Sequence, residues 1–93
     1  MGIKQTIIEL KKEYRDFFLE IAYEDLPMVL LEKLRILKSG ADGLIKLRCD
    51  EYELDLMIGL LTLEANYHDD NEVRKKACHI KAILKGYREQ LKV

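Results

Sequence analysis

Residues 44–49 read Leu-Ile-Lys-Leu-Arg-Cys, and this short stretch has a different hydrophobic period from the rest of the chain. Ile45, Leu47 and Cys49 would lie on one side of an extended segment, and the residues between them on the other. A period of two over six residues is typical of a half-buried β-strand. The sequence offers no second strand candidate, and a lone strand would leave backbone donors and acceptors unpaired. Three arrangements would resolve this: pairing with a second copy across a two-fold axis, an extended linker in water, or addition to a partner's sheet.

On both sides of this segment, apolar residues recur every three or four positions, which is the period of an amphipathic helix. Asp50 with Glu53 forms a capping-box pattern, and Asp69 with Glu72 repeats it, so each pair predicts a helix start. The turn before the last helix is short, which predicts an antiparallel hairpin of the third and fourth helices. The predicted helices run approximately over residues 3–23, 26–38, 50–67 and 72–92.

These patterns together predict an all-α fold, in which four helices form one compact domain over residues 1–93. The only non-helical element in this prediction is a short extended or β segment at about 44–49, between the second and third helices. Gly59 falls in the middle of the third helix, where glycine costs about 1 kcal/mol relative to alanine. A close helix crossing at this position would explain the glycine.

Composition excludes several classes of protein. With 48% hydrophobic and 35% charged residues, the 93-residue chain is expected to fold and not to be disordered. Its net charge of −1 gives no global attraction to nucleic acid or anionic lipid, and no apolar run approaches the ~20 residues of a membrane span. Two cysteines are too few for a disulfide framework, so we expect a cytoplasmic protein. Residues 1–6 fit the N-myristoylation pattern, although the start of a helix is the favoured interpretation.

Catalytic and ligand-binding motifs are not evident in the sequence. Ser39-Gly40 is better explained as a helix stop than as a nucleophile, and there is no glycine-rich phosphate loop. Cys78 and His79 are adjacent on a predicted helix, so their side chains diverge by about 100° and do not share a metal easily. We expect Cys49 and Cys78 to be buried small apolar residues. The sequence therefore predicts a non-enzymatic protein without cofactor or metal.

Charge is strongly segregated in the second half of the chain. Residues 50–72 carry a net charge of −8, and residues 73–93 carry +6. In an antiparallel hairpin, the two helices would complement each other electrostatically. Alternatively, the acidic end around residues 50–55 and 68–72 would dock a basic partner. A basic stripe on the last helix, roughly 27 Å long, is a candidate contact for a partner or for nucleic acid, although no aromatic residues interleave it. Its members are Arg74, Lys81, Lys85, Arg88 and Lys92.

The middle helices carry more apolar positions than one copy of a four-helix protein easily buries. The leading hypothesis is therefore a small protein-interaction or regulatory module that self-associates as a homodimer and can bind a partner protein. The alternative hypothesis, which we do not favour, is nucleic-acid binding through the basic stripe of the last helix. No membrane association is expected. The candidate self-association residues are Leu44, Ile45, Leu47, Leu56, Leu60 and Leu63.

Overall fold

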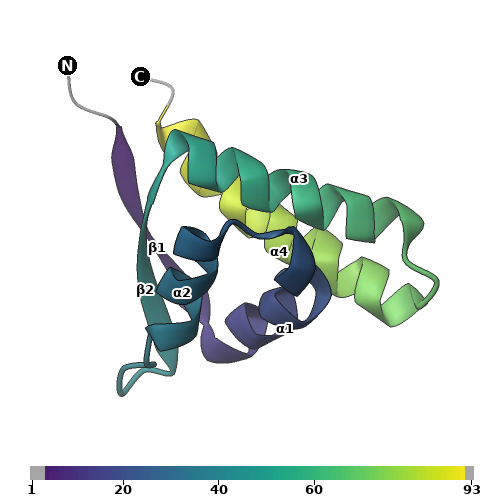
Figure 1. Cartoon of the computed structure of the whole chain (residues 1–93), viewed down its shortest axis with the longest axis horizontal. Helices are drawn as coiled ribbons and strands as arrows, with labels where there is room; N and C mark the ends of the chain where they lie inside the picture. Colours follow the sequence, from purple (N-terminus) through teal and green to yellow (C-terminus); the bar gives the residue numbers. More distant parts are fainter. Residues whose placement is uncertain (1–3, 92–93) are drawn as a thin grey trace. The chain divides into compact units, whose positions relative to one another are not determined.

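The computed structural model describes residues 4–91 and contains two strands as well as helices (Figure 1). The predicted helix start at Ile3, Gly2 of the acylation pattern over residues 1–6 and the predicted helix end at Lys92 lie outside the described residues. In chain order the elements are β1 (Gln5–Lys11), α1 (Lys12–Ala22), the 3-10 turn η1 (Tyr23–Asp25), α2 (Met28–Ile36), β2 (Leu44–Asp50), α3 (Glu51–Tyr67) and α4 (Asn71–Gln90).

The predicted all-α fold is wrong, because the fold is α+β: 68% of the described residues are helical and 16% form a two-stranded antiparallel sheet. The error lies in residues 5–11, which form β1 and not the first turns of a helix. Ile8 and Leu10 are buried between exposed neighbours, so this segment also has a period of two. The β-branched run from Thr6 to Ile8 favours an extended backbone, because branching at Cβ fits a pleated surface better than a helix.

The segment predicted over 44–49 is a strand, β2, and its partner is β1 of the same chain. The strand is therefore not alone: its backbone pairs with β1 along one edge, within the same chain. The alternation is as predicted, since Ile45, Leu47 and Cys49 are buried and Lys46 and Arg48 are exposed. These strands are an integral part of the fold, not one short segment between helices.

The chain divides into two compact units, Ile7–Arg48 and a second unit formed by Met1–Thr6 with Cys49–Val93. In the first unit, α1 packs against α2, and Arg15 is buried with 6% of its surface exposed. Its Nη1 donates hydrogen bonds to the carbonyls of Leu34 (2.6 Å) and Leu37 (2.7 Å). The last carbonyls of a helix have no partner within the helix, and a cation is favoured beside them. Arg15 thus stabilises the C-terminal end of α2. The helix ends at Ile36, two residues before the predicted end at Lys38.

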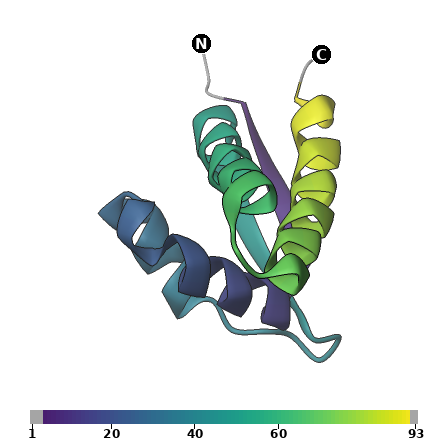
Figure 2. The ribbon, with the colours of Figure 1, turned by 90° about the vertical axis from the view of Figure 1, so that its right-hand side faces the viewer.

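The second unit is dominated by the hairpin of α3 and α4, which lie side by side (Figure 2). The predicted capping box is present: Asp50 accepts a hydrogen bond from the backbone N–H of Glu53 (2.8 Å), and Glu53 accepts one from Asp50 (3.0 Å). At the start of α4 the cap is Asp70, one residue after the predicted Asp69, and it accepts from the N–H of Glu72 (2.9 Å). The prediction of a single domain over residues 1–93 stays a prediction.

Candidate protein-interaction surface

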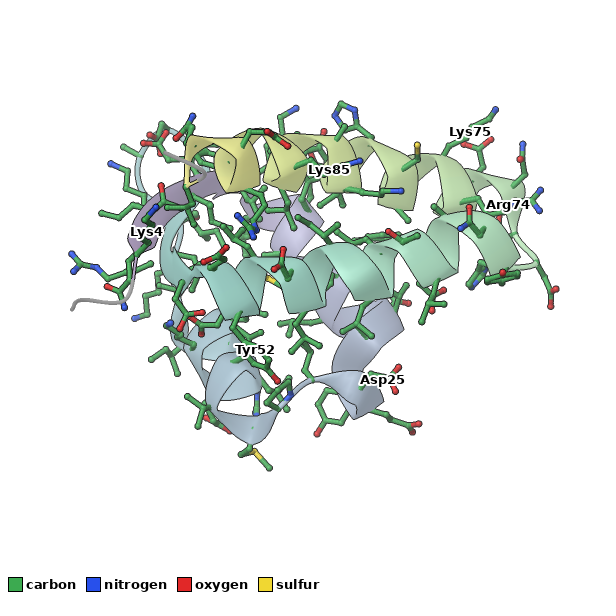
Figure 3. All side chains as sticks on the ribbon, turned by 90° about the horizontal axis from the view of Figure 1, so that it is seen from above. Lys4, Asp25, Tyr52, Arg74, Lys75 and Lys85 are labelled. Carbon is green, nitrogen blue, oxygen red and sulfur yellow. The ribbon has the colours of Figure 1, made fainter. Side chains whose placement is uncertain are left out.

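Helix α3 is apolar on two opposite faces, and only one of them is covered. Leu54 and Leu61 on the covered face have no exposed surface at all. On the opposite face, Tyr52 is 69% exposed, Leu63 55% and Tyr67 76%. Figure 3 shows Tyr52 on the side of α3 that is turned away from α4. Single exposed apolar residues are ordinary on a protein surface, but several on one helix face mark an interaction site.

We call the uncovered face the α3 stripe. At about 100° of rotation per residue, its members fall within an arc of roughly 100°, and no charged side chain lies in this arc. Its aromatic and leucine members are exposed or half-buried, and its glycine is exposed. The members of the α3 stripe are Tyr52, Leu56, Gly59, Leu60, Leu63 and Tyr67.

Gly59 is the unusual member of the α3 stripe, because a glycine inside a helix costs about 1 kcal/mol relative to alanine. The packing of the chain does not require it: a Cβ built on Gly59 would meet no atom within 4 Å. The close helix crossing expected here is therefore not found among residues 4–91. What the glycine does provide is an exposed spot on the helix without a side chain, where another chain can approach the backbone closely.

The six residues predicted to drive self-association separate into two groups. The three on α3, Leu56, Leu60 and Leu63, lie together in the α3 stripe. On β2, Ile45 and Leu47 are buried, with 0% and 1% of their surface exposed, and Leu44 is half-buried. A partner could not reach Ile45 or Leu47 without opening the fold. The sequence reasoning did not assign Tyr52, Gly59 or Tyr67 to this surface, although their helical spacing from the leucines is visible in the sequence.

A second set of exposed apolar side chains lies on α2, in the other unit. Met28 is 68% exposed, Val29 77% and Ile36 72%. Exposed charged residues, Glu32 and Arg35, lie between them and form an ion pair of 3.3 Å. This face is therefore shorter and more polar than the α3 stripe, and it contains no aromatic residue.

The basic stripe predicted on α4 is partly engaged within the hairpin. Arg88 donates hydrogen bonds to Glu51 (2.5 Å) and Asp55 (2.7 Å) on α3, and its side chain is 18% exposed. The hydrogen bond to Asp55 raises the pKa of Arg88 above its ordinary value, and the electrostatic attraction of both carboxylates acts in the same direction. Arg88 therefore links the acidic helix to the basic one, as expected if the segregated charges complement each other.

The other members of the basic stripe lie along α4 outside this link. Arg74 is half-buried and donates to Asn71 (3.2 Å), Lys81 is half-buried, and Lys85 is exposed. Figure 3 labels Arg74 and Lys85 on the helix. Lys92 lies outside the described residues. Without Arg88, the continuous row of bases that could follow a phosphate backbone is interrupted near its C-terminal end.

Open hollows occur in the unit Ile7–Arg48, and carboxylates from Glu13, Asp16 and Asp42 contribute to their linings. The larger has a volume of about 480 Å³ and the other about 440 Å³, and lysines, glycines and Leu44 contribute to their linings. Within residues 4–91, no group of three or more His, Cys, Asp or Glu could hold a metal ion. Cys49 and Cys78 form no disulfide; Cys49 is buried as predicted, whereas Cys78, which was also predicted to be buried, is exposed.

In the part of the chain that the structure describes, no helix combines the length and the apolar character needed to cross a membrane. No protein-family model, curated protein or solved structure matches this chain. A functional proposal must therefore come from the geometry of its surfaces.

Proposed function

We propose that this chain is a small non-enzymatic protein-interaction module that self-associates as a homodimer, and that the α3 stripe is its binding surface. The observation that supports the proposal most strongly is the difference between the two apolar faces of α3. One face is fully buried, while Tyr52, Leu63 and Tyr67 on the other remain more than half exposed. A helix that is apolar on two sides is typical of an element that is covered on two sides.

The chemistry of the stripe fits a protein interface. Burying apolar surface contributes about 25 cal/mol per Å², and tyrosine gives a large contact area with a hydroxyl that can stay at the wet rim. Tyrosine is enriched in the energetically dominant positions of interfaces, and charged residues are depleted from their centres. The α3 stripe has a tyrosine near each end, Tyr52 and Tyr67, and no charge between them within the arc.

The expected affinity is modest. A standard interface uses about 20–30 residues on each side, and one helix face supplies fewer. We therefore expect a dimer with a Kd on the order of 10 µM, which is near the weak end of specific complexes. Such a dimer forms and separates within a concentration range that is easily reached in the laboratory.

Sedimentation velocity with light scattering, from about 1 to 500 µM, tests the proposal around the expected Kd. The wild-type mass should rise from monomer toward dimer, and Leu63→Glu should remain monomeric because a charge would be buried in the apolar interface. Val29→Glu is the matched control, since it places the same charge on an exposed apolar position of α2. It should dimerise like the wild type. The proposal is contradicted if the wild type is a monomer at every concentration, or if both variants lose dimerisation equally.

A further inference from the structure

The α3 stripe has a mirror-symmetric order of residue types along the helix. Its members fall in three pairs that are equidistant from the midpoint between Gly59 and Leu60: Tyr52 with Tyr67, Leu56 with Leu63, and Gly59 with Leu60. The two outer pairs each join residues of the same type. The midpoint of these pairs lies almost at the centre of α3, which runs from Glu51 to Tyr67.

This order has a physical consequence for a dimer. When a two-fold axis relates two helices that pack antiparallel, residue i of one copy opposes residue j of the other, and residue j opposes residue i. A mirror-symmetric stripe then meets itself with matching residue types along its whole length. A partner of unrelated sequence has no use for such symmetry, whereas a second copy of α3 does.

Resting on the proposed self-association, we propose that the partner of the α3 stripe is a second copy of α3, packed antiparallel about an axis between Gly59 and Leu60. Tyr52 then packs against Tyr67 of the second copy, and Leu56 against Leu63. At the centre, Leu60 of each copy lies over Gly59 of the other. A side chain there fills a space that the neighbour leaves open, because a Cβ on Gly59 meets nothing within 4 Å.

The pair at the centre distinguishes antiparallel from parallel packing. In a parallel dimer, Gly59 would face Gly59 and Leu60 would face Leu60, which leaves a void at one position and crowds the next. In the antiparallel dimer each leucine meets a glycine, and both positions are filled evenly. The mid-helix glycine, which nothing within residues 4–91 requires, then has a reason: it admits the leucine of the second copy.

Disulfide trapping tests the register directly. The background is Cys78→Ser, which removes the exposed thiol, while the buried Cys49 is kept. A disulfide requires Cα atoms within about 7 Å, and helices rise about 1.5 Å per residue. In the antiparallel dimer the two copies of position 52 lie roughly 22 Å apart along the helix axis, whereas position 52 of one copy lies beside position 67 of the other.

The antiparallel geometry predicts the outcome of three cross-linking experiments under oxidising conditions. Tyr52→Cys alone should give no cross-linked dimer, Leu60→Cys alone should give one, and a mixture of Tyr52→Cys with Tyr67→Cys should give the mixed dimer. Links between two copies of Tyr52→Cys, without the mixed link, overturn the antiparallel register but leave self-association standing. A wild-type chain that stays monomeric at all concentrations overturns both.

A second variant keeps the inference testable if cysteine at a tyrosine position prevents association. Gly59→Ala should weaken dimerisation about tenfold, because the new methyl group occupies the space of Leu60 of the second copy. Gly86→Ala is the matched control on α4, where a Cβ also meets nothing within 4 Å. It should leave the dimerisation constant unchanged. Equal dimerisation of Gly59→Ala and the wild type contradicts the central packing.

Discussion

Helices α3 and α4 form one hairpin, yet their outer faces differ. The outer face of α4 presents Lys75, His79 and Lys85 to water, as expected of a helix that needs only its neighbour and its core. The outer face of α3 presents Tyr52, Leu63 and Tyr67 instead. Both helices bury an apolar face within the fold, so the hairpin explains the buried faces of α3 and α4 but not the exposed large apolar residues of α3. These exposed residues of α3 are the basis of the functional proposal.

The largest expected effect on stability comes from a comparison of substitutions on the two faces of α3. Leu61→Ala, on the fully buried face, should lower the free energy of unfolding by about 2–5 kcal/mol, because it leaves a cavity in a packed core. Leu63→Ala, on the α3 stripe, should lower it by less than about 0.5 kcal/mol in dilute protein. Urea denaturation at a concentration well below the dimerisation constant measures both. A comparable loss in Leu63→Ala would place that side chain in the core and remove it from the proposed surface.

A second contrast concerns the buried cation of the other unit. Arg15→Met keeps much of the side-chain volume but removes the hydrogen bonds to the carbonyls of Leu34 and Leu37. Leaving these carbonyls without a partner should lower the free energy of unfolding by about 2–4 kcal/mol, since hydrogen bonds from a charged donor are stronger than those from a neutral one. Thermal unfolding followed by circular dichroism measures the loss. An unchanged midpoint would show that water replaces the guanidinium at the end of α2 without cost.

A third prediction uses the two open glycines of the hairpin. Gly59→Ala and Gly86→Ala should each raise the stability of the monomer by about 1 kcal/mol, because alanine favours the helix and neither new Cβ meets an atom within 4 Å. Only Gly59→Ala should also weaken dimerisation. Denaturation of dilute protein gives the first quantity, and sedimentation gives the second. A stabilised Gly59→Ala that dimerises more tightly would contradict the proposed interface.

A smaller effect is expected from the link between the two helices. Arg88→Gln removes the ion pairs with Glu51 and Asp55, so it should lower the unfolding midpoint in low salt, and the difference from the wild type should shrink as salt is added. The raised pKa of Arg88 lies above an already high ordinary value, so the guanidinium stays charged around neutral pH in folded and unfolded chains alike. Salt, not pH, is therefore the useful variable. A salt-independent difference would indicate that packing, and not charge, carries the effect.

The smallest expected effect concerns the basic stripe of α4. Since Arg88 is engaged with α3, we expect no salt-sensitive shift of duplex DNA or single-stranded RNA at about 150 mM salt, and hence no effect of Lys81→Glu or Lys85→Glu. Gel shifts over a range of salt concentrations measure this. A clear shift that weakens with salt and is lost in both variants would favour the nucleic-acid alternative.

Much of the second unit could be read from the sequence because its local signals agree. The capping box of Asp50 and Glu53, the turn before α4 and the period of the apolar residues all predict the same hairpin. The α3 leucines could be assigned to a surface for the same reason. Gly59 could be recognised as unusual, but whether anything packed on it could not be read without coordinates.

The N-terminal segment could not be read correctly because two periods fit it. Ile7 and Leu10 belong to a helical stripe that continues into α1, whereas Ile8 and Leu10 belong to the alternation of a strand. Periodicity alone does not decide between them over seven residues. The extended form of residues 5–11 is favoured because β1 then forms backbone hydrogen bonds with one edge of β2. The alternation of β2 predicted that Ile45 and Leu47 share one face, and the structure shows that this face is buried and not exposed to a partner.

The central claim, that the outer face of α3 and not that of α4 is an interface, is tested most directly by amide NMR spectra of the wild-type chain in a dilution series. We predict concentration-dependent shifts or broadening at Tyr52, Gly59 and Leu63, together with unchanged positions for Lys75 and His79 on α4. Spectra that do not change with concentration, or changes confined to α4, would contradict the account.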